Sequence, residues 1–120
     1  MDQSDKSRLL NGDEIKVMEM LGFMFVNQGM LSQAIKTVNA LNVIDPTNSW
    51  AAFTKVVLFF MKEDYEKVIA LSDRLLQRSP KKYNHTELKK LKARALFRLD
   101  RKKEATAIMR EIMAQSSDNN

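Results

Sequence analysis

The feature that most constrains this chain is the recurrence of a proline after two similar helical stretches. Pro46 and Pro80 each follow a stretch with the apolar periodicity of a helix. Proline disfavours helical backbone in the residue before it, so each proline predicts the end of a helix. The two prolines are 34 residues apart, and the recurrence of the same pattern at this interval predicts a fold built from repeated pairs of helices.

The composition agrees with a helical repeat and excludes several kinds of chemistry. Of the 120 residues 44% are hydrophobic and 29% charged, with three glycines and no cysteine. Such a content suits one mostly helical domain. The missing cysteines exclude a disulfide scaffold and a thiol nucleophile. His85 is the single histidine, which leaves too few ligands for a histidine-centred metal site. No phosphate loop, nucleotide fingerprint or nucleophile elbow occurs either. We therefore expect no catalytic residue, no metal and no cofactor, and a protein that is not an enzyme.

The first predicted repeat covers residues 15–48. Gly29 supplies a permissive backbone between its two helices. Gly22 and Ala34 are small, so we expect the two antiparallel helices to approach each other closely. The positions predicted to pack between the helices are Met18, Leu21, Gly22, Phe25, Ala34, Val38 and Leu41.

Two further repeats are predicted over residues 49–82 and 86–119. In the second, Glu63 stands at the turn position where the first repeat has glycine. The third is displaced by three residues, and the stretch 81–85 takes up the insertion. Thr86 is its expected helix N-cap. The predicted packing positions are Ala52, Val56, Phe59, Val68, Leu71, Leu75, Leu76, Ala93, Leu96, Ala105, Met109 and Ile112.

This pattern resembles the tetratricopeptide (TPR) repeat, whose period is about 34 residues. The fold class implied is all-α, a right-handed TPR-like solenoid of about three helix-turn-helix hairpins. We expect one domain over residues 15–115, with an N-terminal extension over 1–14 and a disordered tail over 116–120. The six expected helices lie near 14–28, 31–44, 49–62, 65–78, 86–99 and 102–115.

A concave groove is the candidate binding site. In such a solenoid the first helix of each pair lines the inner surface. Between residues 50 and 61 only Thr54 and Lys55 are not apolar, whereas packing against a partner helix needs one apolar stripe. The second stripe predicts a surface that binds a hydrophobic or amphipathic segment. The alternatives are ordinary core packing and filling of the groove by Leu9 and Leu10. The predicted groove residues are Phe23, Val26, Asn27, Trp50, Phe53, Val57, Phe60, Met61, Arg94, Phe97 and Arg98.

The charge is concentrated in the second half of the chain. Residues 1–60 hold five basic and six acidic residues, and residues 61–120 hold fifteen and nine, so the halves carry −1 and +6. A one-sided basic balance suggests an anionic partner such as nucleic acid, whereas the plainer interpretation is a solvated helix surface. The candidate basic patch is Arg101, Lys102 and Lys103.

The length, the three repeats and the apolar groove resemble the small TPR chaperones of bacterial type III secretion, of the YscY-like and YscG-like groups. Leu21-Gly22, Gln28-Gly29 and Asp45-Pro46 carry the resemblance. It implies a cytoplasmic protein that holds a helical segment of an exported protein, either an export component or the needle subunit. A second small chaperone or the export gate is a further implied partner. The longest apolar run, Val56 to Met61, is too short to span a bilayer. A generic TPR scaffold and a nucleic-acid binder are the alternative functions.

Overall fold

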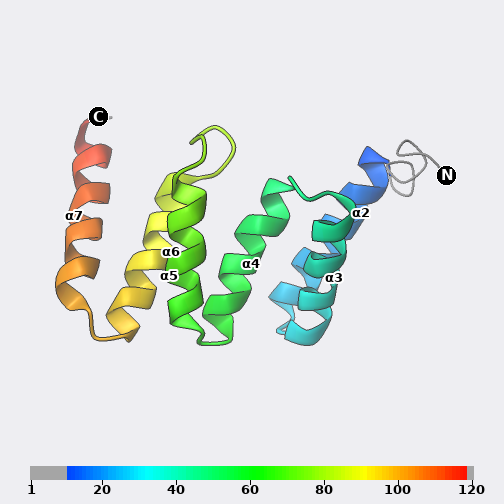
Figure 1. Cartoon of the computed structure of the whole chain (residues 1–120), viewed down its shortest axis with the longest axis horizontal. Coiled ribbons are helices and arrows are strands. Elements are labelled where there is room, and N and C mark those ends of the chain that lie inside the picture. The colour runs from blue at the N-terminus through cyan, green and yellow to red at the C-terminus, as the bar shows by residue number, and fades with distance from the viewer. Residues whose placement is uncertain (1–10, 119–120) are drawn as a thin grey trace. The chain divides into compact units, whose positions relative to one another are not determined.

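The computed structural model describes residues 11–118, and within them the chain is all-α (Figure 1). Each helix begins and ends within three residues of its predicted bounds, and α7 continues over residues 116–118, which were predicted as disordered tail. None of the described helices has the length and apolar character needed to cross a membrane. The helices are α2 (Gly12–Asn27), α3 (Leu31–Ile44), α4 (Ser49–Met61), α5 (Tyr65–Leu76), α6 (His85–Arg98) and α7 (Lys102–Asp118).

Alternate helices begin with the same asparagine cap. The side-chain oxygens of Asn11, Asn48 and Asn84 each accept a hydrogen bond from the backbone N–H three residues later, at 2.9, 2.8 and 3.1 Å. Each bond satisfies one of the N–H groups that a helix start leaves without a partner. The prediction of Thr86 as a cap was wrong, because Asn84 already caps α6 two residues earlier.

The turns after α2, α4 and α6 have one backbone geometry. Gly29, Glu63 and Asp100 adopt left-handed conformations, with φ of 72°, 61° and 62°. In each turn this residue donates its N–H to the carbonyl three residues before it, and the next residue donates to the carbonyl five residues before itself. Paired bonds of this kind around a left-handed residue end many helices. The second turn follows the first by the predicted period, and the third follows the second by that period plus the predicted three-residue displacement.

These turns define equivalent positions in the three predicted repeats, counted from the left-handed residue of each turn. The residues seven before the turn and five after it are buried in all three repeats, as the repeat predicted. They are Gly22, Val56 and Ala93 before the turn and Ala34, Val68 and Ala105 after it.

The chain divides into two compact units, Met1–Leu58 and Phe59–Asn120, here called unit 1 and unit 2. The boundary falls inside α4 and therefore within the second predicted repeat. In unit 1, α2 and α3 run antiparallel, and the first part of α4 packs against them (Figure 1). The buried residues of this core are Ala34, Val38, Leu41, Ala51 and Leu58.

In unit 2, α5, α6 and α7 pack in sequence, each antiparallel to the one before it (Figure 1). Tyr83, from the loop between α5 and α6, is buried with them, and the His85 ring lies 2.9 Å from the Arg78 carbonyl oxygen. The loop that carries the insertion is thus anchored at both ends. The buried apolar side chains of this core include Val68, Ile69, Leu75, Leu88 and Leu96.

Some predicted packing positions were wrong. Leu21 is 43% exposed and Met109 is 41% exposed. Along α4 the fully buried side chains include Ala51 and Leu58, whereas Ala52 and Phe59 are only partly buried. A helix that is apolar on nearly every side does not define its buried face by periodicity alone.

Candidate functional site

The predicted groove residues fall into two sets, one in each unit. Unit 1 holds Phe23, Val26, Asn27, Trp50, Phe53 and Val57, and unit 2 holds Phe60, Met61, Arg94, Phe97 and Arg98. The structure brings Phe23 together with Trp50. It also brings Arg94, Phe97 and Arg98 together. Filling of the groove by Leu9 and Leu10 concerns residues outside the described part of the chain.

A pocket of about 470 Å³ lies between α2 and the start of α4, and we call it the unit 1 pocket. Phe23 is 57% exposed there, which is unusual for a phenylalanine. An exposed apolar cluster flanked by charged residues is typical of a surface that binds another chain. The lining residues are Lys16, Glu19, Met20, Phe23, Met24 and Trp50.

Trp50 forms part of this pocket because Gly22 leaves room for its indole. A Cβ atom at Gly22 would lie 2.7 Å from Cη2 of Trp50 and 3.3 Å from Cγ2 of Thr37. The sequence predicted that this glycine lets two helices approach, and the structure shows that it also admits the indole. Trp50 is partly buried against the unit 1 core, so it belongs to both the core and the pocket.

The other predicted groove residues of unit 1 lie outside the pocket lining. Val26 is partly buried against the unit 1 core, and Asn27 is exposed at the end of α2. Phe53 and Val57 are partly buried on α4. Phe23 and Trp50 are therefore the two predicted residues that the pocket unites.

Sequence reasoning missed a row of exposed apolar residues on α2. Val17 and Met20 are 62% and 67% exposed, and Leu21 and Met24 extend the same side of the helix. Their spacing of three, four and seven residues places all four on one helical face. The signal was available, because α2 carries apolar residues on nearly all sides.

One rim of the unit 1 pocket is fixed by hydrogen bonds. The Glu19 carboxylate accepts a hydrogen bond of 2.9 Å from the side-chain amide of Asn48. The same amide group donates to Asp45 at 3.3 Å, while the Asn48 oxygen caps α4. Asn48 is buried, so this network holds Glu19 to the loop between α3 and α4. The pocket therefore has an apolar floor and a positioned carboxylate at its rim.

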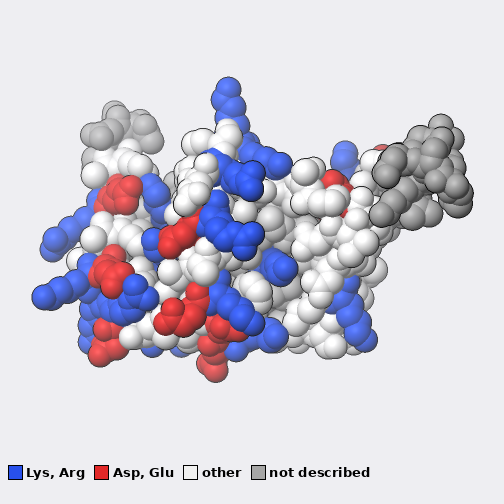
Figure 2. All heavy atoms as spheres, viewed as in Figure 1, with Lys and Arg blue, Asp and Glu red and all other residues white. Residues whose placement is uncertain are grey.

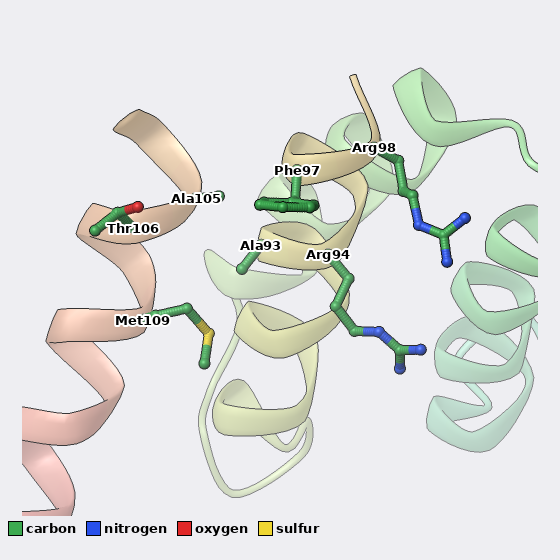
Figure 3. Close-up of a pocket in the computed structure, with 7 residues that line it drawn as sticks. All are labelled: Ala93, Arg94, Phe97, Arg98, Ala105, Thr106 and Met109. Carbon is green, nitrogen blue, oxygen red and sulfur yellow. The ribbon is translucent and has the colours of Figure 1, made fainter. Parts of the chain in front are cut away.

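Unit 2 contains a pocket of about 570 Å³ between α6 and α7, which we call the unit 2 pocket (Figure 3). Phe97 stands at its centre and is 58% exposed. The Arg94 guanidinium lies 4.8 Å from the centre of the Phe60 ring, which itself packs edge to face against Tyr65. The lining residues are Ala93, Arg94, Phe97, Arg98, Ala105, Thr106 and Met109. Met61, the remaining predicted groove residue, is exposed at the end of α4 and does not line it.

The predicted basic patch is largely neutralised by neighbouring carboxylates. Arg101 donates two hydrogen bonds to Glu104, at 3.0 and 2.8 Å, and Lys102 lies 3.7 Å from Asp100. The hydrogen bond between Arg101 and Glu104 lowers the pKa of Glu104 and raises the pKa of Arg101. Lys103 is exposed. Carboxylates are interspersed among the cations on the face shown in Figure 2.

This chain matches no protein-family model, no curated protein and no solved structure. Its class is therefore defined by the fold and the pockets alone. Over residues 11–118 it is all-α, with three equivalent turns and an apolar pocket in each of its two units. Within residues 11–116, no group of three or more acidic or histidine side chains is placed to hold a metal ion.

Proposed function

We propose that this chain is a non-catalytic helix-binding chaperone that covers a hydrophobic or amphipathic segment of another protein at the unit 1 pocket. The observation that carries the proposal is the exposure of Phe23, Met20 and Met24 around the partly buried Trp50. Apolar side chains exposed together on a folded surface lower their free energy when a partner covers them.

The chemistry of the pocket supports a helical segment as the ligand. The two methionines have flexible side chains that adapt to different apolar partners. Phe23 and Trp50 offer large, rigid contact areas of the kind found at the centres of interfaces. Lys16 and the positioned Glu19 at the rim would select charged residues on the polar side of an amphipathic helix.

The proposed architecture is the right-handed TPR-like solenoid, and the proposed client is an exported protein. Three turns of one geometry, recurring at or near the TPR period, support the repeat. The resemblance to type III secretion chaperones supports the rest: a cytoplasmic protein that keeps an export component or needle subunit soluble and unassembled, with a second small chaperone or the export gate as a further partner.

Nucleic-acid binding is the weaker candidate. Arg101 and Lys102 are engaged with Glu104 and Asp100, which reduces the positive potential that a phosphate backbone would meet. Further ion pairs on α6 join Lys89 to Glu111, Lys90 to Glu87 and Lys92 to Asp73. Among the described residues, no observation favours nucleic-acid binding over the binding of an apolar segment at the unit 1 pocket.

The proposal is tested by isolating the client and titrating its segment. The tagged chain is purified from its native host, the co-purifying protein is identified, and peptides covering it are synthesised. Trp50 is the only tryptophan in the chain, so its fluorescence reports directly on the unit 1 pocket. We expect a blue shift on binding, and an affinity that changes little with salt because the contact is apolar.

The key variant is Phe23→Asp, with Val43→Asp as the matched control. Both residues are exposed in unit 1, but Val43 lies on α3 and does not line the pocket. An unpaired charge at Phe23 would have to be desolvated by the bound segment, which costs several kcal/mol, or roughly a hundredfold or more in affinity. Equal binding by the two variants would contradict the proposal. Tight binding to RNA that weakens steeply with salt would favour the alternative.

A further inference from the structure

Each end of the repeat series presents an apolar surface. At the start, α2 exposes Val17, Met20 and Met24, which we call the head surface. At the other end lies the unit 2 pocket between α6 and α7. Terminal repeats of solenoids normally carry polar outer faces that keep the protein soluble. Two apolar ends on one chain therefore need an explanation.

The unit 2 pocket corresponds to a place that is filled in unit 1. We call the hollow along which two antiparallel helices meet a crease. In unit 1, the crease between α2 and α3 holds α4, whose Ala51 and Leu58 pack in one cluster with Ala34 and Val38. The unit 2 residues equivalent to Ala34 and Val38 are Ala105 and Met109, and both line the pocket. The pocket is thus the same crease between α6 and α7, without a helix in it.

The head surface corresponds to the face of α4 that fills the unit 1 crease. Val17, Met20 and Met24 occupy the positions of the first repeat that are equivalent to Ala51, Thr54 and Leu58 in the second. The three residues of α4 are buried, whereas the three residues of α2 are more than half exposed. The head surface therefore has the register of a helix that docks into a crease of this type.

We propose that α2 of a second copy of this chain occupies the unit 2 pocket, so that copies associate head to tail. The docked α2 would lie in the crease between α6 and α7 as α4 lies in the crease between α2 and α3. Val17, Met20 and Met24 would contact the pocket lined by Ala105 and Met109.

The sizes of two paired positions favour this occupant. Gly22 leaves room for Trp50 in unit 1, because a Cβ atom there would approach the indole to 2.7 Å. The equivalent of Gly22 in the unit 2 pocket is Ala93, which has that Cβ atom. The equivalent of Trp50 in α2 is Lys16, whose flexible side chain does not need the space that an indole requires.

The charges are also complementary. Among the described residues, the unit 2 pocket is lined by Arg94 and Arg98 and by no carboxylate. Both arginines leave α6 on the side away from α7 and so border one edge of the pocket (Figure 3). Against the single cation Lys16, α2 carries three carboxylates, Asp13, Glu14 and Glu19. Opposite charges at the edge would add to the apolar contact and favour encounter.

The sequence that directly precedes α2 offers few apolar residues to set against the head surface. Leu9 and Leu10 directly precede the cap residue Asn11, and an extended chain spans at most about 3.6 Å per residue. Met24 lies thirteen residues along the helix from Asn11, about 20 Å at 1.5 Å per residue. Residues 1–8 include one apolar side chain, Met1, so a second copy is the better-matched occupant.

This contact joins two different surfaces, so every added copy leaves one free head and one free pocket. Association of this kind continues with concentration unless the rotation between copies closes a ring. Met20 and Met24 belong both to the head surface and to the unit 1 pocket, so a bound client would compete with a second copy. The inference itself requires no client and does not depend on the proposed function.

The test uses the full chain alone and two complementary variants. Met24→Asp places a charge on the head surface, and Met109→Asp places one in the unit 2 pocket. Both residues are partly or largely exposed, so both variants should fold, as circular dichroism would verify. In sedimentation velocity we expect the mass of the wild type to rise with concentration, while each variant alone remains monomeric. The two variants mixed should form a complex of twice the monomer mass, because each supplies the surface that the other lacks.

Every other outcome overturns the inference. A wild type that stays monomeric at all concentrations excludes head-to-tail association. If Met24→Asp stays monomeric while Met109→Asp still associates, the contact would be a symmetric one between two α2 helices. A mixture that forms no complex would show that the two surfaces do not meet. Val43→Asp serves as the control and should associate like the wild type, and its failure would indicate nonspecific aggregation.

Discussion

The first and last helical creases of this chain differ in what covers them. Between α2 and α3, Val38 is buried because α4 packs over it. Between α6 and α7 the equivalent residue, Met109, is 41% exposed and borders a pocket. The turns that precede α3 and α7 have the same hydrogen bonds. The local fold of a repeat is therefore set within it, whereas its burial depends on the helix that follows.

The largest expected effect comes from a charge in the covered crease. Ala34 has no exposed surface, so Ala34→Asp would bury an unpaired carboxylate at a cost of several kcal/mol. We expect unit 1 to unfold, with loss of helical circular dichroism and a shift of Trp50 fluorescence to that of an exposed indole. The equivalent substitution Ala105→Asp borders the solvent-open unit 2 pocket and should be tolerated better. Equal loss of structure in both variants would show that the two creases are equally covered.

The next largest effect on stability is expected when side chains are shortened to alanine at equivalent positions of the two creases. Val38→Ala deletes fully buried apolar surface and should lower the free energy of unfolding by about 2 kcal/mol. Met109→Ala deletes a side chain that is already 41% exposed, so less apolar surface is lost and its cost should be smaller, about 1 kcal/mol or less. Chemical denaturation of the two variants against the wild type measures both. A larger loss of stability for Met109→Ala than for Val38→Ala would contradict this prediction.

The positions of the helices and turns were predictable because local features of the sequence mark them. The two prolines, Gly29 and the small residues Gly22 and Ala34 mark turns and close approaches, and the helices followed within three residues. The exposure of Leu21 and Met109 was not predictable in this way. Both occupy positions that pack when another helix adjoins, and periodicity identifies a packing position without showing whether a neighbour is present.

The candidate site was predicted only in part for the same reason. Phe23 and Trp50 were placed in one groove, and they do line one pocket. Met20 and Met24 were missed, because the first helix of a repeat was assigned a single binding stripe. The role of Trp50 depends on Gly22, which lies on a different helix, and the spacing of either residue alone does not express that relation.

Ser72 occupies the position in the second predicted repeat that is equivalent to Val38 and Met109. Its replacement by alanine is expected to raise the free energy of unfolding rather than lower it. Ser72 is completely buried in α5, and its hydroxyl has no hydrogen-bond partner within the described residues. Burying an unsatisfied hydroxyl costs free energy that an alanine does not incur. Ser72→Ala should raise the free energy of unfolding by about 1 kcal/mol, measured by denaturation. The control Ser32→Ala, at an exposed position of α3, should show no such gain. A destabilised Ser72→Ala would mean that the hydroxyl is satisfied by a bound water.

The smallest expected effect is a pH dependence at the start of α7. The hydrogen bonds from Arg101 stabilise the charged form of Glu104 and hold its pKa below the usual range for glutamate. The native state therefore binds this proton less readily than the unfolded state. The contribution of the pair is complete above the ordinary glutamate pKa and is lost as the pH falls through the lowered native pKa.

An NMR titration of the Glu104 carboxyl group tests this prediction directly. We expect its midpoint to lie below that of an exposed glutamate without a basic partner, and Arg101→Gln should return it towards the ordinary value because the charged donor is removed. Both side chains are exposed, so salt should screen the Coulombic part of the shift and the effect on stability should be small. A midpoint that does not change in Arg101→Gln would show that the pair does not persist in solution. In that case Arg101, with Lys103, would be free to contribute to a basic surface, and nucleic-acid binding would gain the positive potential that the ion pair now reduces.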